Sequence, residues 1–294
     1  MIRSRKPADM PTDEDSARIS LTAHYTGYTW YRHGLSHRGL ITPTGRALYT
    51  ALRPLNGGAR RLGLPNLDGL LLARHRALDA WLEQAIVDGR VSQVIEVAAG
   101  LSPRGWDFAR RHGDRITYIE ADLADMAKLK RNRLQKMGAT SAHHRVVALD
   151  ALADGGPGSL SDLAAALDRK TGLAIITEGL LNYFSRRQVL LIWQRFARVL
   201  RPFPQGLYLS DLHIASDNRG LAARSFVALL SRFVRGEVHL HFRSALEARS
   251  ELISAGFPAV EVIHPECDEE SADAQERRSA RLVRVLRAGT RTKP

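Results

Sequence analysis

The chain has 294 residues, of which 44% are apolar and 25% charged, as is ordinary for a globular protein with a sizeable core. No run of eighteen or more apolar residues occurs, so the sequence offers no evident membrane-spanning helix. The net charge of +12 raises nucleic acid as a partner. Because the basic residues are scattered, with one dense cluster at the C-terminus, a solvated basic surface is the favoured interpretation.

The start of the chain and its cysteine content bear on its location. Residues 1–18 include basic residues without an apolar stretch behind them, which predicts a disordered tail rather than a secretory signal. Cys267 is the only cysteine, which excludes an internal disulfide and a cysteine-rich metal site. These features favour a cytoplasmic protein.

The next segment precedes the main domain. Residues 19–65 combine Tyr, His, Gly and Pro with short apolar stretches, which indicates short helices and loops. Apolar residues then recur at helical spacing until Gly89 interrupts them, which predicts a helix over 68–88. We expect residues 19–90 to form a helical lid segment.

From residue 91 onward, predicted strands and helices alternate. Short apolar runs predict strands at 93–98, 115–122, 144–150, 172–179 and 206–213. Amphipathic stretches that end at Gly or Pro predict helices at 103–113, 123–138, 159–168 and 186–200. Strict alternation of this kind is typical of a parallel, doubly wound sheet.

The alternation breaks after the fifth strand. Residues 214–243 are expected to form a helical insertion, and 244–257 another helix. Two last strands, 258–264 and 279–288, follow as a hairpin-like pair. The prediction for 91–290 is therefore an α/β fold with a Rossmann-like, mostly parallel seven-stranded sheet, the variant found in class I methyltransferases that use S-adenosylmethionine (SAM).

Acidic residues gather at the predicted carboxyl ends of the strands, where open α/β sheets bind ligands. SAM suits this pattern, because its ribose, adenine and ammonium groups all donate hydrogen bonds. The loop AAGLSPRG after the first strand is small and contains glycine, but it matches neither a dinucleotide nor a phosphate-loop motif. The acids of this edge are Glu96, Glu120, Asp122, Asp150 and Glu178.

The stretches LLARHRALDAWL, QVIEVAAGLSPRGWDFA, ITYIEADLADMAKLKR and ITEGLLNYF occur in this order. With AHYTGYTWYRHGLS near the N-terminus, they resemble the leucine carboxyl methyltransferase family. The resemblance covers most of residues 19–265 and points to the bacterial branch similar to the O-methyltransferase of tetracenomycin polyketide synthesis. It implies a SAM-dependent methyltransferase.

The resemblance also implies roles for particular residues. Arg74 would bind the carboxylate of SAM, and Glu178 would lie near its ammonium group or the methyl-transfer centre. The other implied contacts are Ala98 and Gly100 along the methionine moiety, Asp122 with Glu120 at the ribose, and Asp150 with Leu152 at the adenine, while Glu96 belongs to the same strand edge. The chain departs from the family pattern at Ala98, commonly glycine, and at Ser102, which replaces an acid.

Methyl transfer to a phenol benefits from a general base, whereas a carboxylate needs none. Histidines His24 and His213 are the candidates for such a base, with His33 and His37 as weaker ones. An aromatic acceptor pocket would be lined by Tyr25, Tyr28, Trp30, Tyr31, Tyr183 and Phe184. His239 and His241 lack a third ligand nearby, so no metal site is expected.

The favoured function is O-methylation of a small-molecule, polyketide-like phenol or carboxylate. Three alternatives stay open: methylation of a protein C-terminal carboxylate, methylation of nucleic acid, and SAM binding without catalysis. The family name motivates the first alternative, the net charge the second, and the altered AAG loop the third.

Overall fold

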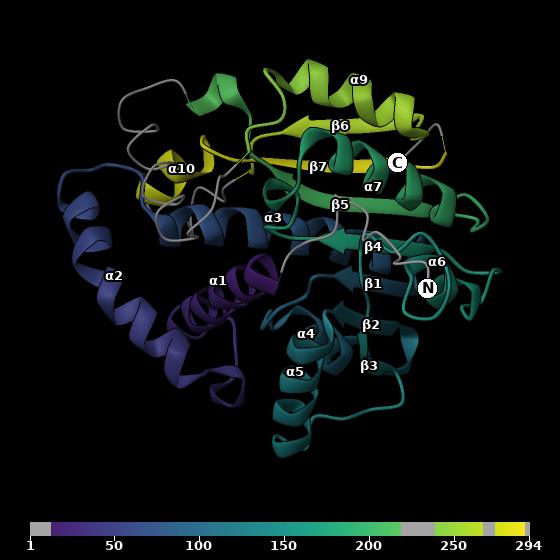
Figure 1. Ribbon diagram of the computed structural model, residues 1–294, viewed down its shortest axis with the longest axis horizontal. Coiled ribbons are helices and arrows are strands. Elements are labelled where there is room, and N and C mark those ends of the chain that lie inside the picture. The colour runs from purple at the N-terminus through teal and green to yellow at the C-terminus, as the bar shows by residue number, and fades with distance from the viewer. Residues whose placement is uncertain (1–12, 219–238, 267–273, 292–294) are drawn as a thin grey trace, which may run out of the picture.

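The computed structural model describes residues 13–218, 239–266 and 274–291, and its centre is one seven-stranded sheet (Figure 1). The strand order is β3-β2-β1-β4-β5-β7-β6. The strands are β1 Gln93–Val97, β2 Thr117–Asp122, β3 His144–Ala148, β4 Leu173–Thr177, β5 Gly206–Leu212, β6 Ala259–Ile263 and β7 Arg284–Gly289.

The direction of the strands agrees with the sequence prediction. Strands β1 to β5 pair in parallel, and β7 pairs antiparallel with both β5 and β6. Strand order reverses between β1 and β4, because the chain first builds outward to β3 and then continues on the other side of β1. A reversal of this kind opens a crevice at the carboxyl ends of the strands, where ligands of such sheets bind.

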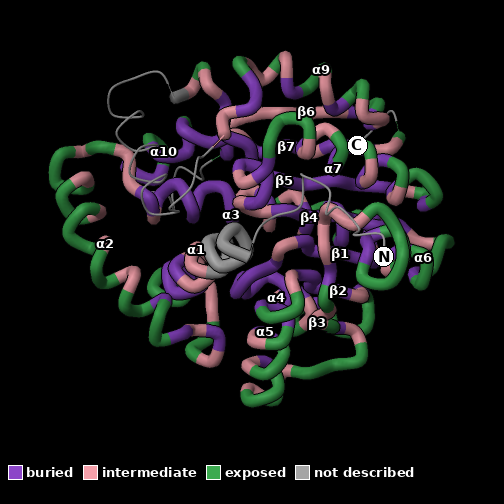
Figure 2. Tube along the Cα trace, in the orientation of Figure 1, coloured by how far each residue is buried: buried purple, intermediate pink, exposed green. Residues whose placement is uncertain are grey.

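Helices cover both faces of the sheet, which explains the continuous apolar runs in its strands. Along β1, Val94 packs beneath α3 and α4, whereas Ile95 packs with α6, α7 and α9. Most strand residues are buried in consequence (Figure 2). The helices after β1 are α4 Arg104–His112, α5 Ala124–Lys136, α6 Leu160–Ala165, α7 Arg186–Leu200, α9 Ala245–Ala255 and α10 Ala274–Ala280.

The N-terminal region differs from the expected short helices and loops. It forms two long helices, α1 Asp13–Arg32 and α2 Pro43–Arg61, before the predicted helix α3, Leu67–Val87. Thr42 caps α2, and the helix continues through Pro54, Gly57 and Gly58, residue types that sequence reasoning treats as breakers. Helix α1 also begins at Asp13, so part of the expected tail is helical, whereas residues 1–12 lie outside the described residues.

The end of the chain holds a second difference. The predicted strand over 279–288 begins only at Arg284, and α10 precedes it. Helix α10 is held against α3 by Glu276, whose two carboxylate oxygens lie 2.7 and 2.8 Å from Nη1 of Arg76.

The predicted insertion 214–243 is described only at its two ends, and the 3-10 helix η4, Ala215–Asn218, lies at the N-terminal one. In the described ranges, no helix is long and apolar enough to span a membrane.

Helix α1 packs directly on the loop that follows β1, whereas α2 lies at the periphery of the molecule (Figure 1). A Cβ atom added at Gly27 would lie 2.7 Å from Cβ of Leu101, and one added at Gly100 would lie 3.0 Å from Cβ of Ala23. Such close backbone approach is possible only without a side chain. Helix α1 therefore packs over the carboxyl edge of the sheet, and we refer to α1 below as the lid.

We expect Gly27→Ala to lower the free energy of unfolding, because the added methyl group would force α1 away from Leu101. Gly57→Ala is the matched control, since Gly57 lies in α2 with no atom within 4 Å of an added Cβ. Higher helix propensity should make Gly57→Ala more stable by about 0.5–1 kcal/mol. Urea unfolding of both variants measures the difference, and equal stabilisation of the two would show that α1 is not packed on the loop.

Candidate functional site

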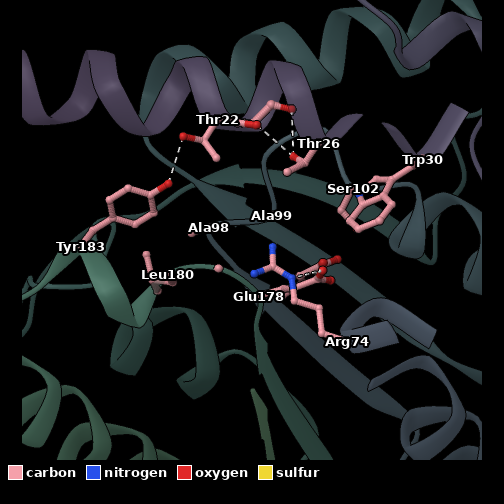
Figure 3. Close-up of a pocket in the computed structure, with 13 residues that line it drawn as sticks. Thr22, Thr26, Trp30, Arg74, Ala98, Ala99, Ser102, Glu178, Leu180 and Tyr183 are labelled. Carbon is pink, nitrogen blue, oxygen red and sulfur yellow. Dashed lines mark hydrogen bonds and ion pairs between the residues drawn. The ribbon is translucent and has the colours of Figure 1, made fainter. Parts of the chain in front are cut away.

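A cavity lies at the carboxyl ends of β1 and β4, beneath α1 (Figure 3). It encloses about 530 Å³ of space, part of which is open to solvent. Its walls come from the lid, from α3, from the loop after β1 and from the segment after β4. The lining residues are Thr22, Ala23, Thr26, Trp30, Arg74, Glu96, Ala98, Ala99, Ser102, Glu178, Gly179, Leu180 and Tyr183.

The loop after β1 turns sharply beside this cavity. Ala98 has a φ of 56° and Gly100 a φ of 49°, both in the left-handed region. Asp122, at the end of β2, holds the turn: its Oδ2 accepts a hydrogen bond of 2.6 Å from the Gly100 amide, and its Oδ1 accepts one from Leu123. Burial raises the pKa of Asp122, although these two amide donors partly offset the shift.

Arg74, from α3, presents part of its guanidinium to the cavity. Its Nε donates to Glu178 over 3.1 Å, and its Nη1 donates to Asp211 over 2.8 Å. Nη2 makes no hydrogen bond within the described parts of the chain and lies close to Gly179. Because Arg74 lines the cavity, Nη2 is the donor that remains for an anionic group of a ligand.

Glu178 follows β4 and is surrounded by cations. Its Oε2 lies 2.6 Å from Nη2 of Arg104 and 2.8 Å from Nδ1 of His75, and its Oε1 accepts from Arg74. Burial alone would raise the pKa of Glu178, but His75, Arg104 and Arg74 together hold that pKa well below the usual value. Glu178 is therefore a fixed negative charge at the cavity wall.

The ionic cluster around Glu178 contains more carboxylates than cations. Its acids are Asp79, Glu96, Glu178 and Asp211, and its cations are Arg74 and Arg104, joined by His75 when that ring is protonated. Burying charge is costly unless it is compensated. The cluster is thus suited to a ligand that carries positive charge.

Several predicted site residues do not reach the cavity. Glu120 is fully buried within the core, where it forms an ion pair of 2.7 Å with Lys130. Asp150 accepts a hydrogen bond from the Leu152 amide, and both residues lie beyond β3, outside the cavity wall. Asp150 and Leu152 follow the carboxyl end of β3, whereas Glu120 is enclosed within the core.

The predicted general bases also lie elsewhere. His24 is hydrogen-bonded to Thr42 over 2.9 Å, and His213 is buried with its Nδ1 3.0 Å from the Leu282 carbonyl oxygen. Neither histidine lines the cavity. Burial lowers the pKa of both rings.

Two aromatic residues of the expected acceptor pocket do line the cavity. Tyr183 donates from its hydroxyl to Thr22 of the lid over 3.0 Å, and Trp30 lies at the other end of the lining, beyond Thr26 (Figure 3). Burial raises the pKa of Tyr183, although the hydrogen bond with Thr22 lowers it in part. Tyr25 and Tyr28 instead pack against Tyr49, away from the cavity.

Sequence reasoning missed the residues that organise the cluster: Asp79, Arg104, His75 and Asp211. Asp211 could have been found, because it ends a predicted strand in the same way as the other acids of the edge. Arg104 and Asp79 had no such signal, since a charged residue on an amphipathic helix normally faces solvent. Within the described residues, no group of His, Cys, Asp and Glu is arranged to hold a metal ion.

The sheet order, the antiparallel β7 and the cleft at the carboxyl edge define a class I SAM-dependent methyltransferase. The family model described as leucine carboxyl methyltransferase matches residues 40–197, more than half of the chain. The chain therefore belongs to the leucine carboxyl methyltransferase family, as the resemblance implied, and its cofactor is SAM. A search of curated proteins found no significant match.

Solved structures share the fold over nearly the whole chain. A DUF574 family protein from Streptomyces avermitilis superposes with a TM-score of 0.60 at 16% identity, over 91% of this chain and 96% of that one. A candidate methyltransferase from Thermobifida fusca gives 0.58 at 13% identity, over 95% and 97% of the two chains. An O-methyltransferase family protein from Burkholderia thailandensis gives 0.51 at 16%, over 94% and 72%. At such low identity these likenesses establish the fold alone.

Ala98 is, among the described residues, the one non-glycine residue with positive φ, so its methyl group is strained. We expect Ala98→Gly to raise the free energy of unfolding by about 1 kcal/mol. Ala99→Gly is the matched control at the neighbouring buried position, where ordinary φ and the lost methyl group predict a decrease of similar size. Denaturant unfolding should give changes in the free energy of unfolding of opposite sign for the two variants. Destabilisation by both substitutions would refute the strain at Ala98.

Proposed function

We propose that this methyltransferase transfers the methyl group of SAM to an oxygen atom of a small molecule, a carboxylate or a phenol of polyketide type. The observation that supports the proposal best is the carboxylate-rich cluster around Glu178, of which Glu96 and Glu178 line a cavity that lies beneath α1. SAM carries a sulfonium and an ammonium group against a single carboxylate, so its net positive charge complements this cluster.

The free Nη2 of Arg74 would bind the carboxylate of SAM, and Glu178 would accept from its ammonium group. Ala98 and Gly100 would lie along the methionine moiety. Asp122 keeps further lone pairs on both oxygens for the ribose hydroxyls, although each already accepts one amide. The adenine would lie near Asp150 and Leu152, while Glu120 is left out because it is enclosed in the core.

SAM, when bound, supplies an activated methyl group, and the residues of the chain then have to align the acceptor with it and exclude water. The lid provides Thr22, Thr26 and Trp30 for this purpose, and Tyr183 faces them from the segment after β4. Holding the two reactants in line contributes about 7–11 kcal/mol in well-oriented reactions.

The choice between carboxylate and phenol depends on a general base. No histidine is among the described residues that line the cavity, and the pKa of Tyr183 is raised by burial, so this tyrosine is a poor base at neutral pH. A carboxylate is already nucleophilic and needs no base. The described cavity therefore favours a carboxylate over a phenol.

A small acceptor also suits the position of the lid better than a macromolecule does. Helix α1 packs on the 98–102 loop through the close contacts of Gly27 and Gly100, and it covers the cavity. Methylation of a protein C-terminal carboxylate, which the family name suggests, would require an extended chain end to pass this helix. Methylation of nucleic acid would likewise require a flipped base to pass this helix.

A methyl-transfer screen with labelled SAM tests the proposed function. The acceptors are small carboxylic acids, phenols, peptides with a free C-terminal carboxylate, and RNA. We expect labelled product from a small acid or phenol. Labelled peptide or labelled RNA without any small-molecule product would overturn the proposal in favour of the corresponding alternative, and SAM binding without product from any class would favour a non-catalytic role.

The residue assignments make a separate prediction for cofactor binding. We expect Arg74→Ala and Asp122→Ala each to weaken SAM binding by about 10- to 100-fold, the range for a lost hydrogen bond to a charged group. Arg76→Ala is the control, because Arg76 lies on the same helix but pairs with Glu276 outside the cavity. Titration calorimetry with SAM measures the affinities, and wild-type binding by both variants would show that the assignments are wrong.

A further inference from the structure

Arg104 is the most completely buried cation of the cavity cluster, with 1% of its surface exposed. It belongs to the first turn of α4, and all three nitrogens of its guanidinium meet an acid. Nε donates to Asp79, Nη1 donates to Glu96 over 2.6 Å, and Nη2 donates to Glu178 over 2.6 Å. The planar guanidinium directs donors from three separate nitrogen atoms to the three acids, whereas the ammonium of lysine presents all of its donors from one nitrogen atom.

The acids that Arg104 joins come from neighbouring strands. Glu96 lies in β1 and Glu178 directly follows β4, which pairs with β1 in parallel. Both carboxylates line the cavity, but Arg104 does not. Arg104 therefore acts on a ligand only through these acids, by setting their positions and their charge.

Besides Arg104, the Glu178 carboxylate has two side-chain partners among the described residues, Arg74 and His75, and each of them is shared with another residue of the cluster. Arg74 binds its second oxygen but is shared with Asp211, and the His75 ring lies 2.9 Å from Arg104 as well as beside Glu178. Trp30 of the lid stacks on His75, with ring centroids 4.3 Å apart, and so covers the cluster from above. The side chain of Glu178 itself is 8% exposed.

We propose that Arg104 is a positioning residue for the amino-acid end of the cofactor: it orients the Glu178 carboxylate so that Glu178 can accept from the ammonium group. This inference rests on the proposed role of Glu178. Without Arg104, two buried carboxylates would lose a shared cation, and Glu178 would be free to rotate or to take up a proton.

Two ligands distinguish this role from a purely structural one. S-Adenosylhomocysteine carries the ammonium group, whereas 5′-methylthioadenosine keeps the adenosine and the sulfur but lacks the amino-acid end. We expect Arg104→Met and Arg104→Lys to weaken binding of S-adenosylhomocysteine about tenfold or more, the range for a charged hydrogen bond, with methylthioadenosine unchanged. Arg111→Met is the matched control, because Arg111 lies on the same helix and pairs with Glu83 and Asp107 outside the cavity.

The pH dependence of binding adds a second measurement. The charged and titratable groups that face Glu178 are Arg74 and His75 from α3, Arg104 from α4, Glu96 from β1, Asp211 from β5 and Tyr183. Loss of Arg104 removes a cation that favours the ionised carboxylate. When pH is lowered, Arg104→Met should therefore lose affinity for S-adenosylhomocysteine at a higher pH than the wild type does.

The variant Glu178→Gln separates the two proposals. If Glu178→Gln binds S-adenosylhomocysteine as the wild type does, the assignment of Glu178 is wrong and the inference fails with it. If Glu178→Gln loses affinity but both Arg104 variants do not, only the role of Arg104 is refuted. Addition of Arg104→Met to Glu178→Gln should bring little further loss if Arg104 acts through Glu178. Urea unfolding shows whether each variant is folded, and Arg104→Lys tests the positioning role if Arg104→Met does not fold. An equal loss of affinity for S-adenosylhomocysteine and for methylthioadenosine would also refute the positioning role.

Discussion

The buried ionic cluster at the carboxyl edge of the sheet is the interaction on which the site depends. Arg74 and Arg104 connect acids from β1, β5 and the segment after β4, so that α3 and α4 are joined to the strands by charge as well as by packing. Breaking a buried pair by removing one partner is strongly destabilising. The relative positions of these elements, and therefore the shape of the cavity, are fixed by the same side chains that carry its charge.

The lid completes the cavity through backbone contacts rather than through charge. Gly27 in α1 and Gly100 in the loop after β1 allow the two segments to approach closely, and Asp122 holds the loop from the other side. Asp122 thus shapes the turn in addition to its proposed contact with the ribose. A loop that is held by a buried carboxylate needs less reorganisation when a ligand binds, which favours affinity.

Acids at strand ends are not equivalent, as Glu120 and Glu178 show. Both are buried and both pair with cations, but Glu120 points toward α4 and α5, where Gly105 and Lys130 enclose it, whereas Glu178 lines the cavity. In the register of the sheet Glu120 is level with Glu96 and Ile176, so Glu120 remains within β2, whereas Glu178 comes two positions after Ile176 and follows the end of β4. Burial with a charge partner is therefore insufficient to identify a ligand-binding acid.

The alternation of strands and helices, the hairpin-like end of the sheet and the family could all be predicted from the amino-acid sequence, because hydrophobic periodicity and short motifs are local features. It also predicted that Arg74, Ala98, Glu178 and Tyr183 belong to one site, and the structure shows that all four line the same cavity. The folded arrangement was needed to show that Arg104 and Asp211 join this cluster, that Glu120 and His213 do not reach the cavity, and that Pro54 lies inside a helix. The physical reason is that these outcomes depend on contacts between residues far apart in the chain, which no local pattern records.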